Sequence, residues 1–526
     1  MMIFKSPHPD LEIPQRNLAE IVMHRATELA DKPAIIDGPT GRTYTYGQLQ
    51  ALIDKFAAGL VARGFKKGDV LGIYMPNVPE YAIAFLGTAA IGGINTTINS
   101  LYSPKEVAFQ LNDSGAKFLL TIPQFMEGAS TAAAESGVEE IFVLGEADGA
   151  TPFSALLDND GSFPAVAIDP AEDLVALPYS SGTTGLSKGV MLTHENLIAN
   201  MVLTASQGHA GENDVFLGLL PFFHIYGMVL ILNMGLYHGG TMVTMPRFEM
   251  EQFLQIAQQY KLTYLSLVPP LVLALAKSPL VDEYDLSNVR MIGSGAAPLG
   301  KELEEAVARR LGCEIYQGYG LTEVSGASHV NPPDPKSMKS GSVGPGIANC
   351  LSRVVDVESG EDLGPNEQGE IWIKGPFLMK GYLNNAEATA DSIDAEGWFH
   401  SGDIGYADDE GYFYIVDRLK ELIKYKAYQV APAELEALLL THPAIADAAV
   451  IPSPDEEAGE VPKAFVVLKG EITPQEIMDW VAGQVAFHKK IRLLEIVDEI
   501  PKSSSGKILR RVLVDRERQS LQSGAQ

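Results

Sequence analysis

The stretch that decides the interpretation of this chain is Ser180-Ser181-Gly182-Thr183-Thr184-Gly185-Leu186-Ser187-Lys188-Gly189, which follows a strand-like run at 174–179. Glycines let backbone N–H groups surround an anion with no Cβ in the way. The hydroxyl side chains add donors, and Lys188 adds positive charge for phosphate oxygens. The order differs from a Walker A loop, because Lys188 is neither preceded by glycine nor followed by Ser or Thr. A generic glycine-rich loop would be a surface turn, but this string predicts a triphosphate-binding loop.

Upstream of this loop, helical and strand patterns alternate. Apolar residues recur at helical spacing between Leu49 and Leu60, and Gly64 is placed to end that helix. A buried strand at 70–75 and a helix from about residue 79 come next. Strands that alternate with helices predict an α/β fold of stacked layers with substantial parallel sheet.

Downstream, the pattern changes twice. From about Gly341, short strand-like runs such as 369–373 and 411–416 are separated by turn residues, which predicts antiparallel sheet or a small barrel. After 417–420, compact α/β patterning resumes, as expected for a second, smaller domain. We therefore expect a large N-terminal domain over residues 1–417, a hinge at 418–420 and a small C-terminal α+β domain over 421–526.

Composition limits the classes of protein that fit. At 526 residues, the chain exceeds one comfortable hydrophobic core, and its 39 basic and 67 acidic residues give a net charge of −28, which repels nucleic acid. The N-terminus has no secretory h-region, the longest apolar stretch (225–245) is interrupted, and two cysteines suit neither a disulfide framework nor a metal site. A basic cluster at 489–511 reads mainly as a solvated helix face. We expect a cytoplasmic protein that spans no membrane, either monomer or homodimer.

The loop at Ser180 resembles the phosphate loop of the adenylate-forming superfamily, which includes acyl-CoA synthetases, firefly luciferase and the adenylation domains of nonribosomal peptide synthetases. Five further segments resemble motifs of this family in the same order, and together they span roughly residues 25 to 512. They are GSGAAP at 293–298, YGLTE at 319–323, SGD at 401–403, DRLK at 417–420 and PKSSSGK at 501–507. Within the superfamily, the chain is most similar to bacterial coumarate–CoA ligase-like enzymes.

The resemblance implies an ATP site assembled from several motifs. Asp403 offers two acceptor oxygens to paired ribose hydroxyls, and Arg418 offers a permanent charge to ribose or phosphate. Glu323 is the implied Mg²⁺ ligand, because a hard cation that bridges phosphates needs one or two carboxylates. Taken alone, these residues would be a turn aspartate, a surface ion-pair partner and a helix cap. The implied ATP contacts are Ser180, Ser181, Gly182, Thr183, Thr184, Gly185, Lys188, Gly295, Ala296, Ala297, Gln317, Gly318, Tyr319, Gly320, Thr322, Asp403 and Arg418.

The resemblance also implies two half-reactions, formation of an acyl-adenylate and its transfer to coenzyme A. Lys507 is the expected catalyst of the first, because it can neutralise the anionic transition state; on its own it would be a solvent-exposed lysine. In the family, the small domain is mobile and rotates about a hinge that Lys420 matches. Lys424 and Gln429 match positions that, in the plant-type coumarate ligases, contact the adenylate during or between the half-reactions. Ala427 stands where the family usually has glycine, near the path of the pantetheine arm, so the identity of the thiol acceptor stays open.

The segment PFFHIYG at 221–227 resembles the acyl-pocket wall of the coumarate ligase and luciferase branches. His224 is expected as a catalytic or gating group near the carboxylate, although a core histidine bonded to backbone fits equally well. No acidic residue follows His224 to pair with an amino group, and small residues leave room for a flat ring or a chain. The expected pocket residues are His224, Tyr226, Gly295, Ala297, Gly318 and Val324.

These observations favour a ligase that acts on an aryl acid of the cinnamate type, with ATP, Mg²⁺ and coenzyme A. One alternative is a ligase for medium- or long-chain fatty acids that forms acyl-CoA or acyl-AMP. The other is a nucleotide-binding module without turnover, which the intact Lys507, Thr322 and Glu323 disfavour.

Overall fold

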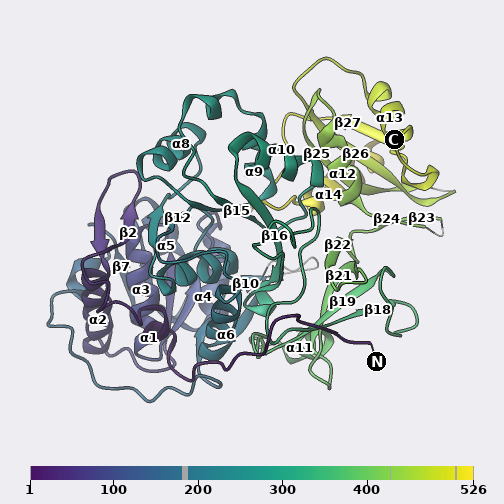
Figure 1. The fold of residues 1–526 in the computed structure, drawn as a ribbon. Coiled ribbons are helices and arrows are strands. Elements are labelled where there is room, and N and C mark those ends of the chain that lie inside the picture. The colour runs from purple at the N-terminus through teal and green to yellow at the C-terminus, as the bar shows by residue number, and fades with distance from the viewer. Residues whose placement is uncertain (1, 181–186, 427, 456, 504–505, 525–526) are drawn as a thin grey trace.

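Two mainly parallel sheets covered by helices form the larger part of the chain (Figure 1). The computed structural model describes residues 2–180, 187–426, 428–455, 457–503 and 506–524. The first sheet has the strand order β10-β11-β9-β5-β4-β6-β7-β8, and β20 pairs with β11. Its strands are β4 (Val70–Tyr74), β5 (Ile94–Thr97), β6 (Ala116–Thr121), β7 (Glu140–Val143), β8 (Thr151–Pro152), β9 (Leu174–Ala176), β10 (Tyr179–Ser180), β11 (Lys188–Thr193) and β20 (Gly381–Tyr382).

The second sheet has the order β17-β16-β15-β14-β12-β13-β2-β3, and the pairing is parallel from β16 to β2. Every residue of β14 and β15 is buried, as expected for strands of a parallel sheet with both faces covered. The strands are β2 (Pro33–Asp37), β3 (Thr43–Thr45), β12 (Val215–Gly218), β13 (Thr241–Thr244), β14 (Tyr264–Leu267), β15 (Met291–Ser294), β16 (Glu314–Leu321) and β17 (Gly326–Val330).

Local sequence signals set the helix boundaries. Thr45 and Gln48 form a capping box at the start of α2, and Gly64, with a φ of +80°, follows its end, where the sequence predicts it. The α-helices of these layers are α1 (Leu18–Val22), α2 (Tyr46–Ala62), α3 (Pro79–Ala90), α4 (Pro104–Ser114), α5 (Met126–Ala134), α6 (His194–Ala205), α7 (Met234–Tyr237), α8 (Met250–Gln259), α9 (Pro269–Lys277) and α10 (Lys301–Leu311). Shorter 3₁₀ turns are η1 (Pro123–Phe125), η2 (Phe153–Leu156), η4 (Pro279–Glu283), η5 (Thr322–Val324) and η6 (Phe487–Lys489), and η3 (Tyr226–Asn233) is a π-helix.

An antiparallel sheet follows these layers, with the strand order β1-β18-β19-β21-β22. It confirms the change of pattern predicted from residue 341, but its first strand comes from the N-terminus, which the sequence did not suggest. Its elements are β1 (Phe4–Lys5), β18 (Leu351–Val355), β19 (Gly369–Lys374), α11 (Ala386–Ser392), β21 (Phe399–Ala407) and β22 (Phe413–Arg418). The predicted mixture of stacked α/β layers and antiparallel sheet is therefore confirmed.

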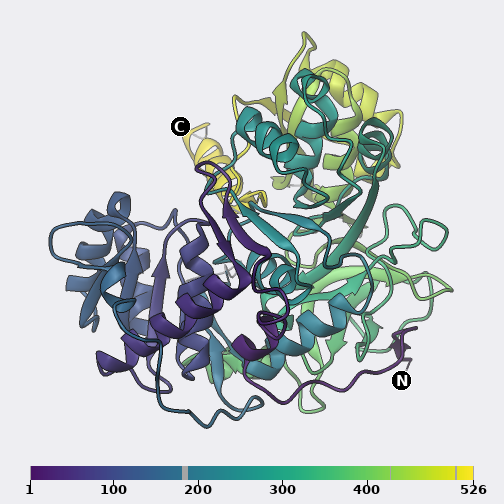
Figure 2. The same ribbon diagram turned by 60° about the vertical axis from the view of Figure 1, so that its left-hand side comes forward.

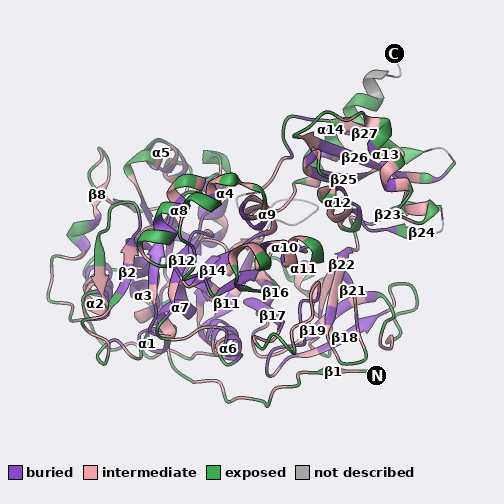
Figure 3. Cartoon of the chain, turned by 45° about the horizontal axis from the view of Figure 1, so that its top comes forward, coloured by how far each residue is buried: buried purple, intermediate pink, exposed green. Residues whose placement is uncertain are grey.

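Residues 421–524, here called the C-terminal unit, form a sheet of order β24-β23-β26-β25 with β27 against β26. The unit has its own core, in which Leu435, Val450 and Val466 are fully buried (Figure 3). It lies beside α9 and α10 (Figures 1 and 2), where Lys277 Nζ donates to the carbonyls of Leu440 and Ile445 at 3.3 and 3.2 Å. Its elements are β23 (Ile423–Tyr425), β24 (Tyr428–Val430), α12 (Pro432–Thr441), β25 (Ile445–Asp455), β26 (Gly459–Leu468), α13 (Pro474–Ala482), β27 (Leu493–Ile496) and α14 (Arg510–Gly524).

The apolar stretch at 225–245 forms η3, α7 and β13, which pack in the main core. Within the part of the chain that the structure describes, no helix combines the length and the apolar character needed to cross a membrane.

Candidate active site

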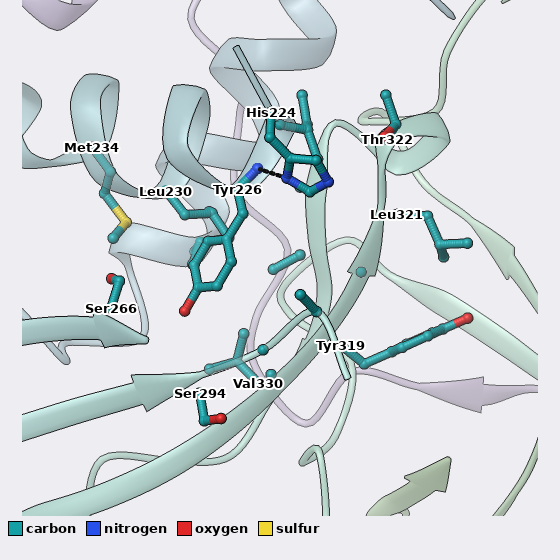
Figure 4. A pocket seen from close by; sticks show the side chains of 18 of the residues that line it. His224, Tyr226, Leu230, Met234, Ser266, Ser294, Tyr319, Leu321, Thr322 and Val330 are labelled. Carbon is teal, nitrogen blue, oxygen red and sulfur yellow. Dashed lines mark hydrogen bonds between the residues drawn. The ribbon is translucent and has the colours of Figure 1, made fainter. Parts of the chain in front are cut away.

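A pocket opens where β14, β15 and β16 end, beneath the π-helix η3 (Figure 4). The carboxyl ends of neighbouring parallel strands are the usual place for a ligand site in an α/β sheet. The cavity encloses about 700 Å³ including its open mouth. The described residues that line it are Thr204, His224, Ile225, Tyr226, Leu230, Met234, Tyr264, Ser266, Ser294, Gly295, Ala296, Tyr316, Gly318, Tyr319, Gly320, Leu321, Thr322, Gly326, Ala327, Val330 and Lys507.

Tyr226 forms one side wall of the pocket. Its hydroxyl donates to the Gly293 carbonyl at 3.1 Å, and Figure 4 shows the ring directed toward the Ser266 side. A Cβ at Gly295 would lie 3.2 Å from the Tyr226 ring, closer than most Cβ contacts. Glycine at 295 therefore leaves room for the Tyr226 ring beside the end of β15.

His224 is a neutral hydrogen-bond donor to the pocket. Burial, and after it the nearby charge of Lys507, lower the pKa of His224 to about 3. The backbone N–H of Tyr226 donates to His224 Nδ1 at 3.3 Å, as the dashed line in Figure 4 marks. Because Nδ1 accepts, the proton of the neutral ring is on Nε2.

Lys507 reaches the pocket on a tight loop of the C-terminal unit. The Ser503 N–H donates to the Lys507 carbonyl at 2.8 Å, and the Lys507 N–H donates to Ser503 Oγ at 3.1 Å. Gly506 has a φ of +77°, and a Cβ there would come within 2.9 Å of Val268, so the loop presses against the end of β14. Burial, followed by the charge of Arg418, lowers the pKa of Lys507. Lys507 and Arg418 thus place two positive charges near each other, and a bound anion would reduce their repulsion.

Asp403 lies behind the pocket wall. The Tyr319 hydroxyl donates to Asp403 Oδ2 at 2.7 Å, and Arg418 Nε lies 3.5 Å from Oδ1. Asp403 is only 6% exposed, and burial raises its pKa although Arg418 opposes the rise. Since Tyr319 lines the pocket, it connects this buried carboxylate to the cavity.

Glu323 and Lys188 meet at Tyr382. The Tyr382 hydroxyl donates to Glu323 Oε1 at 2.9 Å, and Lys188 Nζ lies 4.7 Å from the centre of the Tyr382 ring. Ser180 and Lys188 face each other across β10 and β11, so the predicted phosphate loop connects two paired strands. Ser181, Gly182, Thr183, Thr184 and Gly185, which the sequence assigns to ATP, lie outside the described residues.

Several predicted residues do not belong to the described pocket lining. The Gln317 amide is bonded to both backbone groups of Leu299 and to Glu304, at 2.7 to 3.1 Å, so it holds a turn together. Val324 is fully buried in the core, and Ala297 lies beyond the lining. Glycines and Thr322 from the same motifs do line the cavity.

Lys424 and Gln429 lie far from the pocket in this arrangement. They face each other in the hairpin β23–β24, both are exposed, and the hairpin lies on the outer side of the C-terminal unit (Figure 1). Lys420 is also exposed, just after β22. Ala427 lies outside the described residues.

Part of the pocket wall was not predicted from the sequence. Tyr264 and Ser266 on β14, and Tyr316 on β16, line the cavity together with Met234 and Val330. The period-two spacing of 264 and 266, and of 316, 318 and 320, was the available signal, because residues two apart share one face of a strand.

Comparisons with known proteins agree with this geometry. Residues 22–383 match the family model for AMP-binding enzymes, and residues 434–507 match the model for the AMP-binding enzyme C-terminal domain. The chain is 46% identical to a 4-coumarate–CoA ligase of Pinus taeda over 98% of this chain and 97% of the relative. It is also 46% identical to 4-coumarate–CoA ligase 2 of Petroselinum crispum over 97% and 96%.

Among solved structures, the anthranilate CoA ligase AuaEII in complex with anthranoyl-AMP superposes with a TM-score of 0.90 at 26% identity, over 97% of this chain and 99% of that one. The predicted resemblance is thereby confirmed. With two matching family models and full-length relatives at 46% identity, the chain belongs to the AMP-binding enzyme family, the adenylate-forming superfamily.

Proposed function

We propose that this protein activates an aryl carboxylic acid with ATP and transfers the acyl group to coenzyme A. The observation that carries the proposal is the position of Lys507, which comes from the C-terminal unit yet lines the same pocket as His224 and Thr322. The full-length relatives are 4-coumarate–CoA ligases, which supports an aryl acid. We place the activity in the cytoplasm, on the basis of composition alone.

In the first half-reaction, a carboxylate oxygen attacks the α-phosphorus of ATP, and pyrophosphate leaves. Lys507 would neutralise the two anions as they meet, which is a task of positioning and charge. Bound triphosphate would offset the repulsion that Lys507 feels from Arg418. The neutral His224 would donate from Nε2 to a carboxylate oxygen, and Thr322 would contact phosphate.

Asp403 and Glu323 complete the nucleotide site. Asp403 keeps lone pairs on both oxygens beyond its contacts with Tyr319 and Arg418, so it can accept from ribose hydroxyls. Glu323 is a carboxylate with one oxygen held by Tyr382, and such a hard oxygen ligand would fit Mg²⁺. When bound, Mg²⁺ supplies charge neutralisation at the phosphates.

The second half-reaction requires the C-terminal unit to turn. Lys507 faces the pocket while Lys424 and Gln429 face solvent, so one rigid arrangement cannot present both sets. We propose that residues 418–420 are the hinge between the domains 1–417 and 421–526, and that rotation brings the β23–β24 hairpin to the adenylate for attack by the thiol.

Pyrophosphate release across a panel of cinnamic, benzoic and fatty acids, with and without coenzyme A, tests this function. We expect release with hydroxycinnamic acids above the other classes, and faster steady-state release when coenzyme A removes the adenylate. If no acid gives pyrophosphate release although ATP binds, the proposal that the protein is a ligase is wrong. If coenzyme A leaves the rate of release unchanged, the proposed thioester step is wrong. If fatty acids are preferred, the proposed substrate is a fatty acid instead of an aryl acid.

Asp417 is predicted to favour the arrangement seen here. Its carboxylate, on the last strand before the hinge, accepts from the Ala433 N–H at the start of α12 at 2.9 Å, and it is 6% exposed. This bond joins the two sides of the hinge and must break when the C-terminal unit turns. Asp417→Ala should slow adenylation about tenfold, the effect of roughly 1.4 kcal/mol of lost hydrogen bonding.

Single-turnover rates of the two half-reactions measure this effect. Thioesterification of a supplied acyl-adenylate should be unchanged or faster in Asp417→Ala. The matched control is Asp409→Ala, an exposed turn residue of the same sheet. Equal slowing of both half-reactions would show that Asp417 supports the fold rather than the arrangement.

A further inference from the structure

The inner end of the acyl pocket is closed by tyrosines from the two strands on either side of β15. Tyr264 on β14 and Tyr316 on β16 both line the cavity, and their hydroxyls hydrogen-bond to each other. Tyr264 is 1% exposed, whereas Tyr316 is partly exposed, toward the cavity that it lines. The Tyr316 ring is thus a pocket wall, and Tyr264 is its support.

The position of the Tyr316 ring is fixed on several sides. Gly293 is its partner on the adjacent strand, and a Cβ there would lie 2.7 Å from the Tyr316 hydroxyl. The ring of His209 lies 4.1 Å away between centroids, and His209 Nε2 is itself 2.8 Å from the Asn331 carbonyl. In a close-packed surrounding of this kind, the ring cannot turn aside without shifts in its neighbours.

Along β16, the large side chain of Tyr316 is followed by glycines that also line the pocket. Tyr316 and Gly318 lie two residues apart on one face of the strand. Gly320 follows a shift in register between Tyr319 and Gly320, and all three residues line the pocket. At about 3.3 Å per residue, the Cα atoms of Tyr316 and Gly320 lie about 13 Å apart. Thr322 follows at the reacting end. Gly318, where a Cβ would meet the His329 carbonyl at 3.4 Å and Val330 at 3.7 Å, leaves room for an acyl group that the tyrosine ring then stops.

We infer that Tyr316 determines the length of the acyl group that this chain adenylates. The inference rests on the proposed function and narrows its range of substrates. The far end of an acid of arylpropenoate size contacts the Tyr316 ring, and the ring excludes a longer linear chain. Behind the ring lie His209 and Arg290, and Arg290, which is paired with Asp214, has a side chain that is 45% exposed. Loss of the ring would therefore extend the cavity toward the surface.

The test compares Tyr316→Ala and Tyr316→Leu with the wild type on cinnamic acid and on hexanoic, octanoic, dodecanoic and hexadecanoic acids, by pyrophosphate release. For both variants, we expect kcat/KM to rise about tenfold or more for dodecanoic acid relative to cinnamic acid, because one or two methylenes of fit already change this ratio by such factors. Tyr316→Phe keeps the ring and serves as the matched control, with an unchanged length profile.

The outcomes separate this inference from the proposed function. An unchanged length profile in correctly folded Tyr316→Ala and Tyr316→Leu, or wild-type use of hexadecanoic acid equal to that of cinnamic acid, would overturn the role of Tyr316 alone. No pyrophosphate release by the wild type with any acid would overturn both. If alanine prevents folding, Tyr316→Leu, which keeps apolar bulk, gives the decisive profile.

Discussion

Lys507→Ala is expected to lower the single-turnover rate of adenylation by about 10²- to 10³-fold, the usual cost of removing one preorganised group that stabilises transition-state charge. Lys507 lines the pocket and is held there by the Ser503 bonds and by Gly506 against Val268. The affinity for ATP should fall much less, because Asp403, Arg418 and Lys188 remain.

The same variant should convert a supplied acyl-adenylate to thioester at the wild-type rate, because under the proposed rotation that step would use the β23–β24 hairpin instead of Lys507. Lys502→Ala is the matched control: this lysine is on the same loop, but its Nζ is paired with Asp447 at 2.5 Å, away from the pocket. Rapid-quench measurement of both half-reactions shows whether Lys507→Ala slows adenylation alone. Equal loss in both half-reactions would mean that Lys507 is needed for folding or docking of the loop.

Arg510→Met is expected to cost about 3–5 kcal/mol of stability, because it leaves buried carboxylates without their cation. The Arg510 guanidinium is paired with Glu421 and, at 2.6 Å, with Glu436, whose other oxygen accepts from the Val450 N–H at 2.8 Å. The side chains of Arg510 and Glu436 are 15% and 9% exposed. Arg511→Met, at an exposed neighbouring position, is the control and should be nearly neutral.

The cost of Arg510→Met should grow with pH. Burial raises the pKa of Glu436 from 4.5 to about 7, and Arg510 opposes that rise. Because the folded pKa lies above the unfolded one, the contribution of Glu436 to stability falls from pH 4.5 to 7 and is constant above. Without Arg510 the folded pKa rises further, so the variant keeps losing stability above pH 7.

Hydrogen exchange of the Val450 amide at pH 6 and pH 8.5, with urea denaturation alongside, measures this prediction. The free-energy gap between wild type and variant should be larger at pH 8.5. A gap that is the same at both values would show that Glu436 is already ionised at pH 6 in both proteins.

The α/β layers and most of the nucleotide motifs could be identified from the sequence, because both depend on residues that are close together along the chain. The helix ending at Gly64 and the strands around residues 70 and 370 follow from spacing along the chain, whereas Thr322 and Lys507 follow from the resemblance of their motifs to those of the family. The hydrogen bonds of the Gln317 side chain to Leu299 and Glu304 were not predicted, because they join residues that are distant along the chain.

What could not be predicted depends on pairing between distant residues. The Tyr264–Tyr316 wall needs the register of β14, β15 and β16, which period-two spacing alone does not give. The basic cluster at 489–511 was predicted to be mainly a solvated helix face, and this was wrong for several members. Lys489 pairs with Glu434, Lys502 with Asp447 and Arg510 with two glutamates, because the C-terminal sheet brings acidic residues beside them.

The N-terminal strand β1 has a consequence for biosynthesis. Lys5 pairs with Leu351, so 346 residues separate two partners in one antiparallel ladder. At about 5–20 residues per second, a ribosome needs about 17–70 s to add that length. Strand β1 must therefore wait for its partner while nearly two thirds of this chain is made, and a chaperone that binds the nascent β1 segment would have that interval in which to act.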